Sequence, residues 1–278
     1  MEIYYNCKKN LFLYCYFLHF NGSKNGGYFS CKTDFTDCTK IEDTLGECPC
    51  HLAVDGNDVY IVNYLSGNIV KNFKRVIYHS GKGVNLPRQD MSHTHFVGFS
   101  PDKKYVIYTD LGLDAIFLCD RDLNEVSFLK VPDGYGVRHF AFSKDGKYIY
   151  AVNELVPSIS TFSYYGGKAN YLNTVKLDCK VQNSTAAAIR LGKEKDMLFV
   201  SVRGENKVYA LKAQAEKVDE LYNLSCRGVG PRDFVICNDL CIVCNEKSND
   251  VAIFNLKNDK HFVSLIKDVA APLCCIVI

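Results

Sequence analysis

The most regular stretch of the chain, residues 134–155, alternates short apolar runs with polar turns. An apolar run from His139 to Phe142 is followed by the tetrapeptide 143–146 (Ser-Lys-Asp-Gly) and by a second apolar run over 148–152. Asp-Gly between two such runs is a strong hairpin signal, because glycine adopts positive φ without steric cost. We therefore predict two antiparallel strands, so that the start of the first and the end of the second meet at one edge.

This pattern recurs along the chain at intervals of about 45 residues. The position that ends the second run, Asn153, has counterparts in the other copies, namely Phe17, Asn63, Asp110, Val202 and Asn245. A short run precedes each hairpin, at 51–54, 95–99, 139–142, 186–191 and 233–236, and two further β-like runs follow it. Four strands at this period are typical of a β-propeller built from four-stranded antiparallel blades.

The two ends of the chain leave the number of blades open. Residues 2–5 predict the first strand of the first copy, and residues 273–278 predict an inner strand with nothing after it. The ring is then six-bladed with an extra strand, or seven-bladed with the N-terminal closing blade incomplete. Residues 213–222 have some helical character, but they occupy the place of an outer strand. Since no linker interrupts the copies, we predict one domain over residues 1–278.

Composition narrows the classes of function. The 278 residues include 47% hydrophobic residues and carry a formal net charge of +2 without any basic block, so we expect neither nucleic acid nor a membrane surface as partner. The longest apolar run, 11–20, is too short to span a bilayer and predicts a buried strand. Fourteen cysteines are scattered through apolar runs, which indicates a reducing, cytoplasmic compartment rather than a disulfide framework. Cys241 and Cys244 are three apart on a predicted strand, so they face opposite sides.

The predicted topology gathers polar residues from distant copies at one mouth of the propeller, because first-strand starts and second-strand ends share a face. Such a group of polar side chains over an apolar scaffold is the default location of a binding site. First-strand starts contribute His51, Ser92, His93, His95, Arg138, His139, Thr185 and Arg232. Second-strand ends contribute Asn63, Tyr64, Asp110, Asp114, Glu154, Arg203, Asn245 and Glu246.

Several of these residues also have a structural interpretation. His93 and His95 lie on one side of a strand, but the spacing provides no third ligand, so we predict hydrogen-bonded histidines and no metal. Glu154 can pair with Arg138 or Arg203 for structural reasons alone. Asn63, Asp110 and Asn245 recur at one repeat position, which favours turn capping over chemistry.

Taken together and in order, the motifs of this chain resemble the lactonase family of β-propellers, which includes propeller-form phosphogluconolactonases and fungal carboxymuconate-cyclising enzymes. The resemblance runs from about Leu11 to the C-terminus. It is carried by residues 49–54 (PCHLAV), 63–64 (NY), 66–67 (SG), 88–89 (RQ), 93–95 (HTH), 100–102 (SPD), 110–114 (DLGLD), 138–139 (RH), 153–155 (NEL), 203–204 (RG), 230–232 (GPR) and Phe234.

The resemblance implies a seven-bladed propeller and, at the matching positions, the catalytic residues His93 or His95, Arg138, Glu154 and Arg203. Three motifs depart from the family pattern. Val137 replaces a proline before the arginine, Val202 replaces an asparagine, and Glu246 replaces a glutamine. The new carboxylate at Glu246 disfavours a phosphate nearby.

We expect the protein to hydrolyse a sugar lactone without a cofactor, with 6-phospho-D-glucono-1,5-lactone of the pentose phosphate pathway as the first candidate substrate. Two alternatives are a muconate-lactonising cycloisomerase and a non-catalytic propeller that serves as a binding module or is a decayed lactonase. The oligomeric state is open. The residues expected to bind substrate are His51, Asn63, Arg88, Asp110, His139, Arg232 and Asn245.

Overall fold

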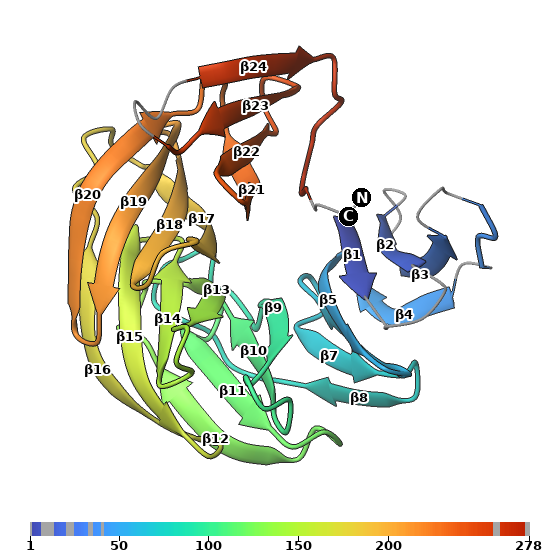
Figure 1. Ribbon diagram of the computed structural model, residues 1–278. Coiled ribbons are helices and arrows are strands. Elements are labelled where there is room, and N and C mark those ends of the chain that lie inside the picture. Colours follow the sequence, from blue (N-terminus) through green and yellow to red (C-terminus); the bar gives the residue numbers. More distant parts are fainter. Residues whose placement is uncertain are drawn as a thin grey trace. The chain divides into compact units, whose positions relative to one another are not determined.

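The computed structural model describes residues 2–6, 14–20, 25–32, 36–39, 42–257 and 262–275. The regular structure in these ranges is all β, without an α-helix. The strands form six four-stranded antiparallel sheets, called blades 1 to 6 in chain order (Figure 1). The predicted all-β propeller of four-stranded antiparallel blades is therefore confirmed. The count of seven blades and the single domain stay predictions.

The described residues form two compact units, which meet in the sequence after Gly134. The N-terminal unit, blue to green in Figure 1, contains blades 1 to 3. Its strands are β1 (Glu2–Asn6), β2 (Tyr14–Phe20), β3 (Asn25–Lys32), β4 (Glu42–Glu47), β5 (Pro49–Asp55), β6 (Asp58–Asn63), β7 (Asn68–Lys71), β8 (Arg75–Tyr78), β9 (Thr94–Phe99), β10 (Val106–Asp110), β11 (Ala115–Cys119) and β12 (Glu125–Lys130).

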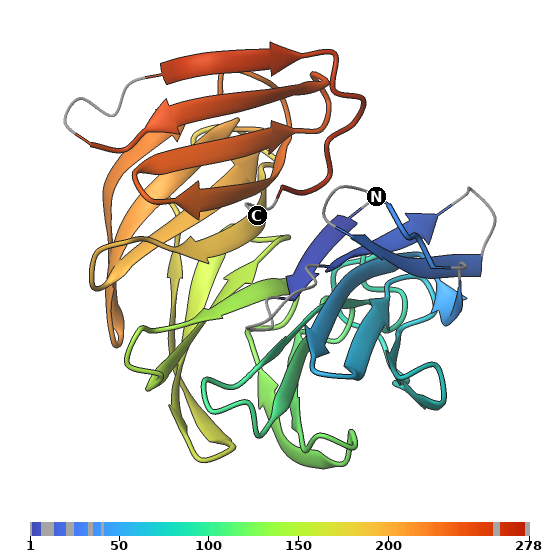
Figure 2. The same ribbon diagram turned by 45° about the vertical axis from the view of Figure 1, so that its right-hand side comes forward.

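The C-terminal unit contains blades 4 to 6, and Figure 2 shows the four strands of blade 6 next to one another. Its strands are β13 (Val137–Phe142), β14 (Tyr148–Asn153), β15 (Ser158–Tyr165), β16 (Lys168–Lys176), β17 (Thr185–Leu191), β18 (Met197–Arg203), β19 (Lys207–Gln214), β20 (Lys217–Ser225), β21 (Pro231–Cys237), β22 (Leu240–Asn245), β23 (Asp250–Asn255) and β24 (Phe262–Lys267).

Each blade is a meander in which every strand pairs with the next one along the chain. The first strands of consecutive blades are also neighbours: β5 contacts β9 in the N-terminal unit, and β17 contacts both β13 and β21 in the C-terminal unit. The predicted first strands all lie within these observed ones. Within each unit, first-strand starts from consecutive blades are therefore brought together, as the sequence predicted.

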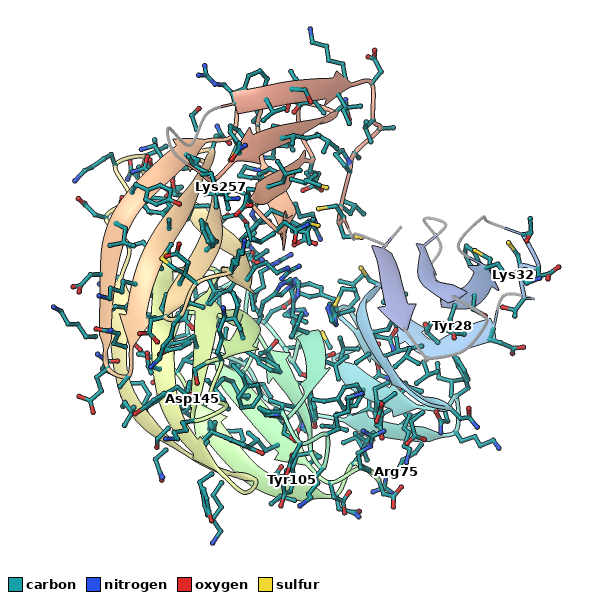
Figure 3. The ribbon with its side chains drawn as sticks, viewed as in Figure 1. Tyr28, Lys32, Arg75, Tyr105, Asp145 and Lys257 are labelled. Atoms are coloured by element: carbon teal, nitrogen blue, oxygen red, sulfur yellow. The ribbon has the colours of Figure 1, made fainter. Side chains whose placement is uncertain are left out.

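The hairpin of blade 4 has the predicted turn. Ser143 O accepts the Gly146 N–H at 2.9 Å, and the Asp145 carboxylate accepts the Ser143 hydroxyl at 2.6 Å. Gly146 has φ of 70°, a conformation that glycine adopts at low cost. Asp145, labelled in Figure 3, lies at the turn and so at the opposite end of the hairpin from Arg138 and Asn153.

The hydrophobic core lies between successive blades. Between blades 4 and 5, Val152 and Ile159 pack with Ile189 and Val200, and all four are at most 1% exposed. This burial follows from the sequence pattern, because strands sandwiched between two blades present apolar side chains on both faces. The packed blades give the polar strand ends a rigid base.

The remaining sequence predictions concern single segments. Residues 213–222 belong to the outer hairpin of β19 and β20, not to a helix. The run 11–20 contains β2 from Tyr14 onward, while 11–13 lie outside the described residues. Residues 273–275 are not in a strand, and 276–278 lie outside the described residues. Free thiols in the described part of the chain include Cys119, Cys179, Cys226, Cys237, Cys241, Cys244 and Cys275. Nowhere in the described ranges is there a helix with the length and apolar character that a membrane crossing requires.

Candidate active site

A recurring β-bulge shapes the start of the first strand in several blades. In blade 4, Val137 is opposite Asn153 and His139 is opposite Val152, so Arg138 is the extra residue. Bulges re-aim a side chain and are frequent beside active sites. The same irregularity places an extra residue at equivalent points of β5, β9 and β21, and these residues are Cys50, His95 and Arg232.

The C-terminal unit contains a buried cluster formed by Arg138, Glu154 and Arg203, which we call the arginine–glutamate cluster. Glu154 Oε2 lies 3.0 Å from Arg138 Nε, and Glu154 Oε1 lies 3.1 Å from Arg203 Nη2. The side chains of Arg138 and Glu154 are 2% and 4% exposed, whereas that of Arg203 is 17% exposed. One carboxylate thus orients two guanidinium groups, and the cluster keeps one net positive charge.

Backbone carbonyls of β17 fix the same two arginines. Arg138 Nη1 donates to Ala187 O at 2.8 Å, and Arg203 Nη2 donates to Ala186 O at 3.2 Å. These carbonyls lie where the pairing of β17 with β18 shifts between Ala186 and Ile189. A bulge leaves backbone groups outside the ladder, so they can accept from side chains. Arg203 is consequently the member of the cluster that both is held in place and reaches solvent.

The N-terminal unit contains an aromatic and histidine cluster around His93. The His93 ring stacks on Tyr64 at a centroid distance of 4.5 Å, and Tyr64 contacts His95 edge-on at 5.7 Å. His93 Nδ1 lies 2.9 Å from Tyr64 O, and Nε2 lies 2.9 Å from Asp90 Oδ1. Since both ring nitrogens face acceptors, the imidazolium form satisfies both contacts. The hydrogen bond from His93 lowers the pKa of the Asp90 carboxyl.

Asp110 holds the segment that carries His93. Its carboxylate accepts hydrogen bonds from Ser92 Oγ at 2.5 Å, His93 N at 2.8 Å and Leu113 N at 3.0 Å. The side chain is fully buried, and burial raises the pKa of Asp110 against the effect of these hydrogen bonds. The geometry favours the bracing of a turn, and a contact with substrate stays a prediction.

Asn63 and Asn245 are buried in equivalent bracing positions. Asn63 Nδ2 donates to Thr44 O at 3.1 Å, and Asn245 Nδ2 donates to Cys226 O at 3.0 Å and to Asp250 Oδ1 at 2.7 Å. Both asparagines have zero exposed surface. The turn-capping interpretation agrees with these contacts, whereas binding of substrate by the two amides is untested.

The other predicted binding residues are distributed over both units. In the N-terminal unit, His51 Nδ1 accepts from Val97 N at 3.3 Å, and Arg88 lies exposed in the connection between β8 and β9. In the C-terminal unit, His139 lies 2.9 Å from Arg138, and Arg232 lies 3.4 Å from Glu246. The predicted residues are therefore divided between the two units, and their catalytic and binding roles stay predictions.

Sequence reasoning missed several contributors to these groups. Asp90 could have been found from its position three residues before His93. Asp233 pairs at 2.5 Å with Arg190, which lies 43 residues away in the sequence, so this pair left no local signal. Burial raises the pKa of Asp233, although Arg190 opposes this shift. The carbonyls of Ala186 and Ala187 left no sequence signal, because any residue type provides one. No group of three potential metal-ligating side chains occurs among the residues that the structure describes.

Comparisons with known proteins give one consistent family. The family model described as "Lactonase, 7-bladed beta-propeller" matches residues 7–277. A 6-phosphogluconolactonase of Bacillus subtilis is 27% identical over 255 residues, which span 82% of this chain and 73% of that protein. A 6-phosphogluconolactonase of Formosa agariphila is 27% identical over 241 residues, which span 77% and 68%. The crystal structure of a Lactobacillus plantarum protein has a TM-score of 0.85 at 26% identity, covering 94% of this chain and 84% of that one.

Proposed function

The chain belongs to the lactonase family of β-propellers, and on this basis we propose that it hydrolyses the internal ester of a sugar lactone, with 6-phospho-D-glucono-1,5-lactone as the substrate. The observation that supports the proposal most directly is the arginine–glutamate cluster, in which Glu154 pairs with Arg138 and Arg203. Its net positive charge suits a reaction that builds negative charge on a carbonyl oxygen.

Lactone hydrolysis needs a nucleophilic water and a partner for the oxyanion. Water adds to the carbonyl carbon, the tetrahedral oxyanion forms, and the bond to the ring oxygen breaks to give a hydroxyl and a carboxylic acid. Arg203, the more exposed guanidinium of the cluster, donates to the oxyanion in this proposal. A well-placed donor of this kind contributes about 3 kcal/mol to transition-state stabilisation.

Glu154 is the base in this proposal. Each of its oxygens forms an ion pair with one arginine, and a carboxylate has about four acceptor sites in total, so acceptor capacity remains for a water hydrogen. Transfer of the water proton to Glu154 as the C–O bond forms, and from Glu154 to the leaving ring oxygen, balances the reaction. General-base assistance of this type gives roughly a hundredfold.

Arg138 is a positioning residue in the same scheme. Its guanidinium is held by Glu154, Ala187 O and His139, and its side chain is only 2% exposed. It therefore orients the carboxylate and has little surface with which to meet a substrate. Arg232 is the proposed partner of the substrate phosphate, because a guanidinium group binds phosphate through paired hydrogen bonds.

The test is a pH-stat assay with 6-phosphoglucono-1,5-lactone, since each turnover releases one proton at neutral pH. We expect the wild type to exceed spontaneous hydrolysis and Glu154→Gln to lose roughly a hundredfold in kcat. The matched control is Asp219→Asn, which removes one carboxylate from the exposed pair with Lys217 on β20. A wild type with no rate above the spontaneous reaction contradicts the proposal and favours a non-catalytic binding protein.

Two further measurements use the same preparation. His93→Gln and His95→Gln test whether these histidines of the N-terminal unit are catalytic, since a structural role alone leaves kcat of the folded enzyme near wild type.

Turnover of a lactonised muconate, without any action on the sugar lactone, identifies a cycloisomerase in place of a sugar lactonase.

A further inference from the structure

Blades 4 and 6 contain the same arginine–glutamate pair at equivalent backbone positions. Arg138 and Arg232 are each the extra residue of a first-strand bulge. Each partner glutamate directly follows the last residue of the second strand, and its N–H donates to a glycine carbonyl, at 2.7 Å for Glu154 and 2.9 Å for Glu246. Since backbone geometry and residue types coincide, Arg232 and Glu246 are the blade 6 counterpart of Arg138 and Glu154.

The two pairs differ in how tightly they are held. Arg138 Nε lies 3.0 Å from Glu154, and Nη1 of the same arginine donates to Ala187 O. Arg232 uses Nη1 for both oxygens of Glu246, at 3.5 Å and 3.4 Å, which is the long end of hydrogen bonding. The side chains of Arg232 and Glu246 are 26% and 28% exposed, against 2% and 4% for the blade 4 pair.

The pair in blade 6 lies on the same side of its blade as the proposed catalytic groups. β17 contacts both β13 and β21, so blade 5, which contributes Arg203, lies between the blades of the two pairs. In all three blades the residues concerned lie where the first strand starts or the second ends. Arg232 and Glu246 therefore flank the arginine–glutamate cluster within the C-terminal unit.

We propose that Glu246 is a specificity-determining residue, which holds Arg232 in a loose ion pair and so restrains the preference of the site for a phosphorylated over an unphosphorylated lactone. This inference rests on the proposed lactonase function. A substrate phosphate has to compete with the Glu246 carboxylate for the guanidinium, and it is repelled by that carboxylate at the same time. A lactone with an uncharged hydroxyl in place of the phosphate neither competes with Glu246 for the guanidinium of Arg232 nor is repelled by the Glu246 carboxylate.

The experiment compares two lactones that differ only in the phosphate, 6-phosphoglucono-1,5-lactone and glucono-1,5-lactone. The measured quantity is the ratio of their kcat/KM values. We expect Glu246→Gln, which keeps the shape of the side chain but removes its charge, to raise this ratio about tenfold at low ionic strength. The higher ratio is expected to come from a lower KM for the phosphorylated lactone, and the effect shrinks when salt screens the charges.

Two controls separate charge at this position from other effects. Asp219→Asn removes the same charge from the outer strand β20 and is expected to leave the ratio at its wild-type value. Arg232→Gln is expected to lower the ratio, and in this background Glu246→Gln is expected to have a smaller effect than in the wild type, because the two residues act as a pair. Equal changes for both lactones, or no change for either, overturn the inference.

Calorimetric binding of the reaction products distinguishes this inference from the proposed function. Titration of 6-phosphogluconate and of gluconate requires no turnover, so it works even if the wild type hydrolyses neither lactone. In that case the hydrolytic function fails, whereas Glu246→Gln must still tighten the binding of 6-phosphogluconate relative to gluconate. If the relative affinities are the same in wild type and Glu246→Gln, the role of Glu246 is refuted whatever the fate of the enzyme activity.

Discussion

Arg138 donates a hydrogen bond to the residue that follows it: its Nη1 lies 2.9 Å from His139 Nε2. A guanidinium has donors only, so Nε2 must be the acceptor and the His139 ring carries its proton on Nδ1. Both side chains are buried, at 2% and 6% exposed. His139 is thereby a neutral support for an arginine that in turn orients the carboxylate of Glu154.

This relationship predicts different effects for two substitutions of His139. In His139→Gln the amide oxygen can reach the place of Nε2 and accept from Arg138, whereas His139→Ala removes the acceptor. We expect kcat to fall about tenfold in the alanine variant and to recover largely in the glutamine variant, because one charge-assisted hydrogen bond to a buried arginine contributes about 1.5–3 kcal/mol. Equal kcat in the two variants contradicts a positioning role for this nitrogen.

Glu154 is expected to contribute to stability as well as to activity. Removing one partner of a buried ion pair leaves an uncompensated charge, here Arg138, and costs about 3 kcal/mol or more. Urea unfolding of Glu154→Gln measures this loss. The double variant Arg138→Met/Glu154→Leu replaces the buried pair by apolar side chains and is expected to regain much of the stability while remaining inactive. A double variant as unstable as the single one shows that packing, not charge, dominates here.

The turn that Asp110 braces also depends on a close backbone approach. A Cβ on Gly112 lies only 1.8 Å from Met91 O and 2.9 Å from His93 N, so an alanine cannot fit without moving the segment that carries His93. We expect Gly112→Ala to lower the free energy of unfolding by about 3 kcal/mol, as overpacking does. The matched control is Gly166→Ala, where φ is 56° and the added Cβ meets nothing within 4 Å, so that only about 1 kcal/mol of backbone strain is expected. If urea unfolding shows the same loss of free energy in Gly112→Ala and Gly166→Ala, the segment that carries His93 moves aside at little energetic cost.

His79 predicts a pH dependence of stability. Burial lowers its pKa below the usual value of 6.5, while its Nε2 lies 2.8 Å from the Tyr108 hydroxyl and its ring stacks on Phe117. The unfolded chain therefore binds a proton at this site at a higher pH than the folded protein. Stability is expected to fall as the pH drops below about 6.5, because the unfolded state then holds more protons.

The measurement is urea unfolding of wild type and His79→Phe between pH 8 and pH 5. The phenylalanine variant keeps a ring on Phe117 but cannot titrate, so its stability is expected to decline less below pH 6.5. Above pH 7 the two proteins are expected to have parallel profiles. A wild-type profile that parallels the variant over the whole range shows that His79 does not contribute to the acid sensitivity.

Much of the fold was readable from local sequence. The Asp-Gly turn at 145–146 and the alternation of apolar and polar runs specified the blade 4 hairpin, and their repetition predicted the first strands now seen as β5, β9, β13, β17 and β21. These signals are local, since turn chemistry and side-chain period act over a few residues. The same reasoning placed Arg138, Glu154 and Arg203 at strand ends of neighbouring blades, and the structure pairs them.

The contacts and burial of individual polar residues were decided only by the tertiary structure. Asn63, Asp110 and Asn245 recur at one repeat position, which favoured turn capping, and all three are fully buried in hydrogen bonds that brace turns. Substrate binding by these residues stays a prediction. Arg138 and Arg232 have similar sequence surroundings, but one is locked by Ala187 O and Glu154 while the other is loosely paired and open to solvent. Sequence by itself determined which residues share a strand end, because that follows from local period and turns. Burial and ion-pair geometry depend on neighbouring blades and on bulges that carry no residue signature, so only the folded structure decided which of these residues are buried and which reach solvent.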